Sequence, residues 1–151
     1  MSPVRRLNRV FRLSKLITEP GGIRVTDAVA AATQNLESVR QTCLDKVDRC
    51  LNEIEALHAE AGRKASPEVR DEIYRLANQI HGLAGVFGLA PLGEAAFSLC
   101  ELIDRLQHAG AWRWDAVEVH LNALRLLRRP EHVDDCDAVL EGLRRVADRA
   151  A

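Results

Sequence analysis

The residue with the clearest chemical potential is His81, which is followed by glycines one, four and seven residues later. Around it, apolar residues recur at steps of three and four, the period of a helix with one buried face: Ile73, Leu76, Ala77, Ile80, Leu83, Ala84 and Phe87. At about 100° per residue, His81 lies roughly a quarter-turn from Ile80, which is at the centre of that face. We therefore expect His81 on a helix, with its imidazole accessible to solvent.

An accessible imidazole can act as a nucleophile, because its neutral form has an unprotonated ring nitrogen. A lone histidine on a helix is nevertheless more often a packed or surface residue than a functional one. Gly82, Gly85 and Gly88 argue for function, since a glycine inside a helix costs about 0.8–1.0 kcal/mol relative to alanine. Bare backbone beside the ring would let another protein approach it, and Tyr74 and Asn78 share that side of the helix.

The stretch from His81 to Leu89 resembles the motif of histidine phosphotransfer (HPt) domains. That motif usually reads His-x-Leu-Lys-Gly, and here Leu83 and Gly85 match it while Ala84 replaces the lysine. A second amphipathic helix follows, as in the family. The resemblance implies that His81 carries a phosphoryl group between receiver-domain aspartates of a hybrid histidine kinase and of a response regulator. It also implies a receiver-docking surface formed by Tyr74, Asn78, Gly82, Ala84, Gly85 and Gly88.

Ala84 is the one departure from the motif, and two hypotheses remain. The retained His81 favours a phosphorelay intermediate, whereas Ala84 favours a non-catalytic adaptor that keeps the HPt shape and binds a receiver or kinase without carrying phosphate. Most of the equipment for transfer, including Mg²⁺ and a lysine, would belong to the receiver, so we expect no cofactor in this chain. We expect all three glycines inside the helix, where no phosphate-cradling loop forms, and hence no autokinase activity.

Length and composition favour a single all-α domain. The 151 residues are 47% hydrophobic but only 4% aromatic, whereas strands favour aromatic and β-branched residues. The net charge of −1 gives no global attraction to nucleic acid. No apolar run approaches the ~20 residues of a membrane span, and the N-terminus lacks the apolar core of a signal peptide. We expect a cytoplasmic monomer.

Capping and breaking residues divide the chain into helices. We expect helices from Thr26 to about Gly62, from Ser66 to about Gly88, from Pro91 to about His108, from Trp112 to a break at Pro130, and from about His132 to Arg149. Short turns make neighbouring helices antiparallel. The prediction is an up-and-down four-helix bundle over residues 23–151, with an extra N-terminal arm or helix over residues 1–22 and a kinked or split C-terminal helix.

The first two segments leave alternatives open. Residues 1–22 hold five basic residues and one acidic residue, and they could fold over the bundle, dock elsewhere or on a membrane surface, or be disordered. The next helix would be on the order of 55 Å long, too long for its shorter partners to cover. It either breaks near Thr33 or overhangs and packs on the basic arm or on a second chain. We favour packing within the chain.

The remaining histidines and the cysteines indicate no second site. Cys43, Cys50, Cys100 and Cys136 lack metal-binding spacing, and most fall on apolar helical faces, so we expect reduced thiols. The other histidines lack the i, i+4 pairing of a helical metal site: His58, His108, His120 and His132. We therefore expect no metal site.

Overall fold

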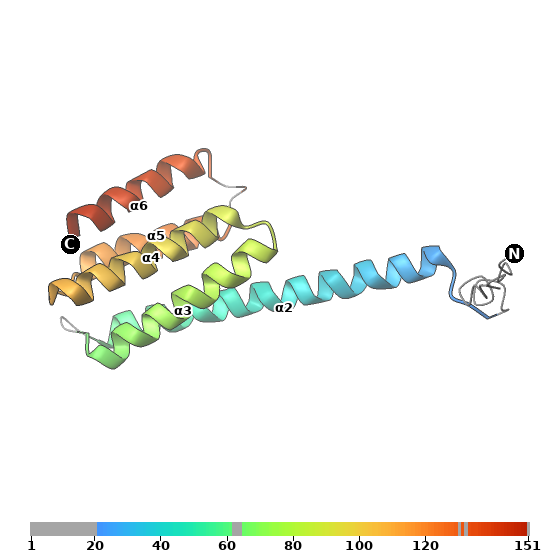
Figure 1. The fold of residues 1–151 in the computed structure, drawn as a ribbon, viewed down its shortest axis with the longest axis horizontal. Coiled ribbons are helices and arrows are strands. Elements are labelled where there is room, and N and C mark those ends of the chain that lie inside the picture. The colour runs from blue at the N-terminus through green and yellow to red at the C-terminus, as the bar shows by residue number, and fades with distance from the viewer. Residues whose placement is uncertain (1–20, 62–64, 130, 132, 151) are drawn as a thin grey trace, which may run out of the picture. The chain divides into compact units, whose positions relative to one another are not determined.

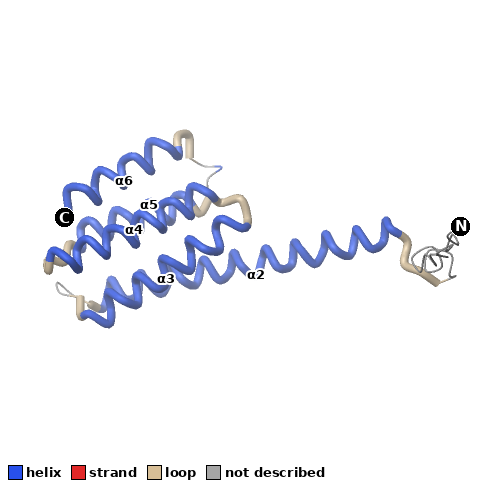
Figure 2. The backbone as a smooth tube through the Cα atoms, in the orientation of Figure 1, coloured by secondary structure: helices blue, strands red, loops and turns tan. Residues whose placement is uncertain are grey.

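The computed structural model describes residues 21–61, 65–129, 131 and 133–150. This part of the chain is helical and contains no strand (Figure 2). Its helices are α2 (Val25–Glu60), α3 (Pro67–Val86), α4 (Ala90–Ala109), α5 (Trp114–Leu127) and α6 (Cys136–Ala150) (Figure 1). The all-α prediction is confirmed. Most of the predicted basic arm lies outside the described residues.

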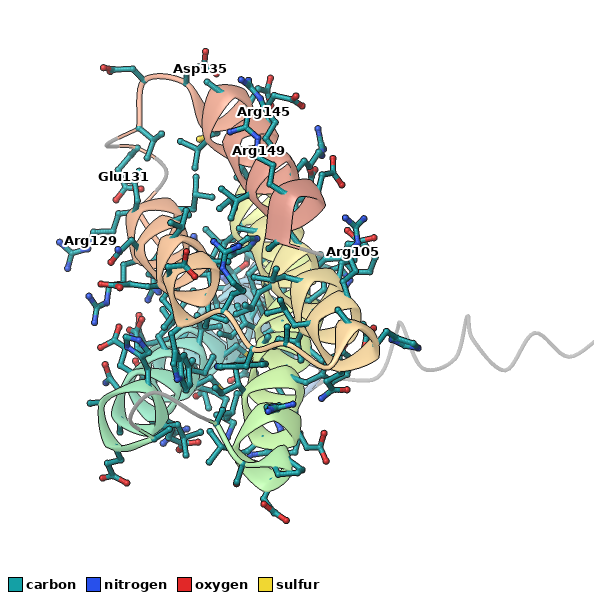
Figure 3. The ribbon with its side chains drawn as sticks, turned by 90° about the vertical axis from the view of Figure 1, so that its left-hand side faces the viewer. Arg105, Arg129, Glu131, Asp135, Arg145 and Arg149 are labelled. Carbon is teal, nitrogen blue, oxygen red and sulfur yellow. The ribbon has the colours of Figure 1, made fainter. Side chains whose placement is uncertain are left out.

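The described chain divides into two units after Ser38. The second unit is the helical bundle, in which α4 packs against α3, α5 and α6, and α6 also contacts α5. Viewed end-on, α6 lies across α4 and α5, on the side away from α3 (Figure 3). The buried part of α2 contributes Val47, Cys50, Leu51 and Ile54 to the same core. Two ion pairs then join α2 to α5, Arg125 with Glu55 and Arg128 with Asp48.

Helix α3, which carries His81, has a capping interaction at each end and is shorter than expected. The Ser66 side chain accepts a hydrogen bond from the Val69 backbone N–H at 3.4 Å, and Pro67 follows in the first turn. At the other end, the Leu89 N–H donates to the Ala84 carbonyl at 3.1 Å across Gly88, whose φ is +75°. This left-handed glycine ends the helix, so the expectation that Gly88 lies inside it is wrong.

The C-terminal helical region is split, as predicted, but α6 begins later than expected. The predicted start was about His132, which lies outside the described residues, and α6 begins at Cys136. The Asp135 carboxylate accepts a hydrogen bond from the Ala138 N–H at 2.9 Å, which caps this end of the helix. Pro130, the predicted breaker, also lies outside the described residues.

The first part of α2 decides between two alternatives that the sequence left open. The helix is unbroken at Thr33, whose hydroxyl donates to the Val29 carbonyl at 2.9 Å. The side chains of residues 21–42 are all exposed, and Cys43, the next residue, is half-buried. Val25, Val29 and Leu36 are thus exposed, and since most of the basic arm lies outside the described residues, the preferred packing within the chain stays a prediction.

The cysteines are free thiols, as expected. Cys50 and Cys100 are buried, and Cys43 and Cys136 are half-buried. Burial, followed by the charge of Asp104, raises the pKa of the Cys100 thiol to about 11. Such a thiol stays protonated and unreactive near neutral pH. In the described part of the chain, no helix is long and apolar enough to cross a membrane.

Candidate functional site

His81 lies in the second-to-last turn of α3, and its side chain is exposed, whereas Ile80 beside it is completely buried. The predicted quarter-turn offset thus places the ring at the edge of the core, facing α4. Two interactions with α4 hold it there, one to a backbone carbonyl and one to an aromatic ring.

The first interaction defines which ring nitrogen is available for chemistry. Nδ1 of His81 lies 2.9 Å from the carbonyl oxygen of Gly93. A carbonyl oxygen can only accept a hydrogen bond, so Nδ1 must carry the proton. In the neutral ring Nε2 is then unprotonated and has a free lone pair. The cross-helix contact therefore orients the imidazole and leaves Nε2 as the nucleophilic atom.

Small residues make this contact between the helices possible. Gly93 is buried, and a Cβ placed on it would lie 3.4 Å from the Cβ of Ala84 and 3.7 Å from the carbonyl oxygen of His81. At these distances an added methyl group would already be in van der Waals contact with α3. Ala84 and Gly93 therefore bring the backbones of α3 and α4 together, which places the Gly93 carbonyl within reach of the imidazole.

The second interaction is with Phe97, one turn further along α4. Its ring centroid is 5.4 Å from that of His81, with the planes tilted by 42°. Phe97 is 50% exposed. Its ring adds to the exposed backbone of Gly82 and Gly85. A partner protein approaching Nε2 would meet this apolar surface.

The docking residues predicted from the sequence divide into three groups. Asn78, Gly82 and Gly85 are exposed on the same region of α3 as His81, and Gly88 is exposed in the turn that follows. Tyr74 is half-buried, two turns before the histidine. Ala84 is completely buried, so its predicted place on the docking surface is wrong: it faces Gly93 instead of solvent.

Sequence reasoning missed Gly93 and Phe97. Phe97 carried a usable signal, because it lies outside the apolar stripe of its helix, which passes through Leu92, Leu99 and Leu102. A large apolar residue on the polar side of a helix marks a surface that contacts something. Gly93 carried no comparable signal, since its role depends on the register between two helices.

Other histidines in the described part of the chain show what distinguishes His81. His108 also directs Nδ1 to a carbonyl, that of Asp104 at 2.7 Å, but the bond lies within its own helix. His120 is buried, with Nδ1 bonded to the Ala116 carbonyl and Nε2 bonded to the Ser98 hydroxyl. His81 alone among these three combines a free Nε2, exposure and a hydrogen bond from a second helix.

Among the residues that the structure describes, no cation is in direct contact with the ring. None of the hydrogen bonds or ion pairs in the described residues brings a lysine or arginine to His81, and Ala84 stands at the position of the usual lysine. The same described residues hold no group of three or more His, Cys, Asp or Glu side chains arranged to bind a metal ion.

Comparison with known families agrees with this geometry. The family model of the Hpt domain matches residues 38–149, well over half of the 151-residue chain. The chain therefore belongs to the Hpt domain family, whose members carry out histidine phosphotransfer in two-component signalling and interact with receiver domains. No curated protein and no solved structure matches it. The matched segment includes α3 and α4, and hence both interactions of His81.

Proposed function

We propose that this protein is a phosphorelay intermediate that carries a phosphoryl group on Nε2 of His81. It would receive the group from the receiver domain of a hybrid histidine kinase and pass it to the receiver of a response regulator. The observation that carries this proposal is the hydrogen bond from Nδ1 to the Gly93 carbonyl, because it leaves Nε2 as the nucleophile on an approachable surface.

The transfer step needs no general base, because no proton has to leave the ring. The Nε2 lone pair attacks the phosphorus of an aspartyl phosphate, an N–P bond forms, and the P–O bond to the aspartate breaks, so the carboxylate leaves with the electron pair. The ring keeps its proton on Nδ1 and becomes positively charged. The Gly93 carbonyl, 2.9 Å from Nδ1, stabilises that charge, since hydrogen bonds to charged groups are stronger than neutral ones. Transfer to the second receiver is the same step reversed.

Position 84 has no lysine, so the positive charge that neutralises the phosphoryl group must come from elsewhere. Ala84 provides no positive charge to the phosphoryl group, so charge neutralisation falls to the docked receiver during transfer. Phosphoryl transfer depends mainly on positioning and electrostatic stabilisation. On this proposal the chain provides the positioning, through the Gly93 bond and the Phe97 contact, and the partner provides the charge.

The test is transfer from a receiver domain loaded with radiolabelled phosphate. We expect an acid-labile, base-stable label on the parent protein, no label on His81→Gln, and normal labelling of His108→Gln. His108 is a matched control, because it is also an exposed helical histidine with Nδ1 bonded to a carbonyl. Phosphorus–nitrogen coupling in NMR spectra should place the phosphoryl group on Nε2. Label retained by His81→Gln, or found on Nδ1, would overturn the proposal.

The second candidate is an adaptor with the HPt fold that binds a receiver without accepting phosphate. Ala84 is the observation that favours it. The same experiment separates the two functions, provided that binding is measured alongside transfer. An adaptor would bind the receiver in a pull-down or titration but acquire no label, and His81→Gln would then bind as well as the parent.

A further inference from the structure

The first part of α2 carries a row of exposed apolar side chains, which we call the α2 seam: Val25, Val29, Ala32, Leu36 and Val39. The exposed fractions of the four larger ones are 79% for Val25, 58% for Val29, 70% for Leu36 and 53% for Val39. Single exposed apolar residues are ordinary on a protein surface. A continuous row along one helix is different, because it indicates a surface that pairs with something.

The spacing of the α2 seam specifies the kind of partner. Its residues follow one another at intervals of four, three, four and three, and Cys43 continues the pattern after another four. The mean interval is that of the heptad repeat, in which two helices pack side by side in a coiled coil. The seam from Val25 to Leu36 also precedes residue 38, where the match to the Hpt domain begins. It is therefore an addition to the phosphotransfer domain.

Charge decides between two candidate helices, the basic N-terminal segment and a second copy of α2. The positions flanking the seam hold Thr26, Ala28, Thr33, Asn35, Arg40 and Thr42. None of these flanking residues is acidic, so they provide no ion-pair partner for a segment with five basic residues. Two copies of these nearly neutral flanks can lie together without repulsion. The acidic residues of this part of α2, Asp27 and Glu37, fall outside the seam and its flanks.

We infer that the α2 seam pairs with the same seam of a second copy, so that the protein forms a homodimer through a two-helix coiled coil. This replaces the sequence-based expectation of a monomer, which assumed a helix covered within its own chain. The seam spans only just over two heptads and contains a single leucine, so we expect a dissociation constant on the order of 10–100 µM. Since His81 lies on α3 and not on the seam, each copy keeps its own phosphotransfer site.

The test is sedimentation velocity of the full chain from about 1 to 300 µM, a range chosen to span that constant. We expect the mass to rise from 16.8 kDa towards twice that value. Leu36→Asp should raise the dissociation constant at least tenfold, whereas Gln34→Asp should leave it unchanged. The two variants place the same charge on the same exposed stretch of helix, but position 34 is on the face opposite position 36. Circular dichroism should show equal helicity for both.

Two results would overturn the inference. A full chain that stays at the mass of one copy over the whole range has no such dimer. A Leu36→Asp variant that dimerises as well as the Gln34→Asp control would mean that copies associate through another surface. Phosphotransfer measured on the same samples should not differ between the two variants, which separates this inference from the proposed function of His81.

Discussion

A substitution at Gly85 tests the docking of a receiver domain separately from the folding of the bundle. It lies one turn after His81 on α3, it is exposed, and a Cβ placed on it would meet nothing within 4 Å. Gly85→Gln therefore introduces no clash within the protein. Glutamine is a much better helix former than glycine, so we expect the free energy of unfolding to rise by about 0.5–1 kcal/mol. For a domain of this size, that corresponds to an increase of roughly 1–5 °C in melting temperature.

The rate of phosphotransfer should fall in this variant, even though its stability rises. The glutamine side chain would project from the surface beside His81, where a receiver must bring its aspartyl phosphate into line with Nε2. We expect the rate of transfer to fall at least tenfold, equivalent to about 1.4 kcal/mol. The assay is single-turnover transfer from a labelled receiver, with thermal melting measured on the same preparation.

Gly142→Gln is the matched control for Gly85→Gln. Gly142 also lies inside a helix, α6, with nothing within 4 Å of a Cβ placed on it. This variant should gain similar stability with unchanged transfer. If Gly85→Gln is more stable than the parent and transfers phosphate at the parental rate, then partners do not approach over this part of α3.

Three further predictions follow from the packing around the site and in the core. Ala84→Lys should lower the free energy of unfolding by several kcal/mol, because Ala84 is completely buried against α4; a variant that melts like the parent and holds its phosphoryl group longer would contradict this. Phe97→Ala should slow transfer several-fold while costing less than about 1 kcal/mol of stability, since the ring is half-exposed; Val119→Ala, exposed to a similar extent on α5, should leave transfer unchanged. Stability should fall as the pH drops below about 6.5, because burial lowers the pKa of His120 and the unfolded chain then binds a proton that the folded chain does not; urea unfolding at several pH values should show a flatter dependence for His120→Gln, and a dependence as steep as that of the parent would contradict this.

Local chemistry in the sequence predicted most helix boundaries, because the residues that set them act within one turn. Ser66 and Pro67 begin α3, and Gly110, with φ of +65°, ends α4. The start of α6 was missed because several aspartates precede it and each could cap a helix. Only the structure shows that Asp135 makes the bond.

The exposed ring of His81 was predictable from helical periodicity, whereas its hydrogen bond was not. Periodicity gives the angle of a residue around its own helix but not the register of that helix against its neighbour. Gly93 is twelve residues from His81 in the chain and accepts a hydrogen bond from its ring. The same limit explains the error at position 84. The sequence put Ala84 on the apolar face of its helix and also among the docking residues, and only the structure shows it against Gly93 where two helices meet.

The small residues at that contact connect the fold of this chain to its missing lysine. Close packing of α3 on α4 requires small side chains where the helices meet, and Ala84 and Gly93 provide them. A long cationic side chain at position 84 would have to leave this contact to reach a phosphoryl group. The same approach brings the Gly93 carbonyl to Nδ1, where it can stabilise the positive charge that develops on the ring. In this chain, on our proposal, the backbone acceptor behind the imidazole stabilises the positive ring, while neutralising the phosphoryl charge, the usual role of the family's lysine, falls to the docked receiver.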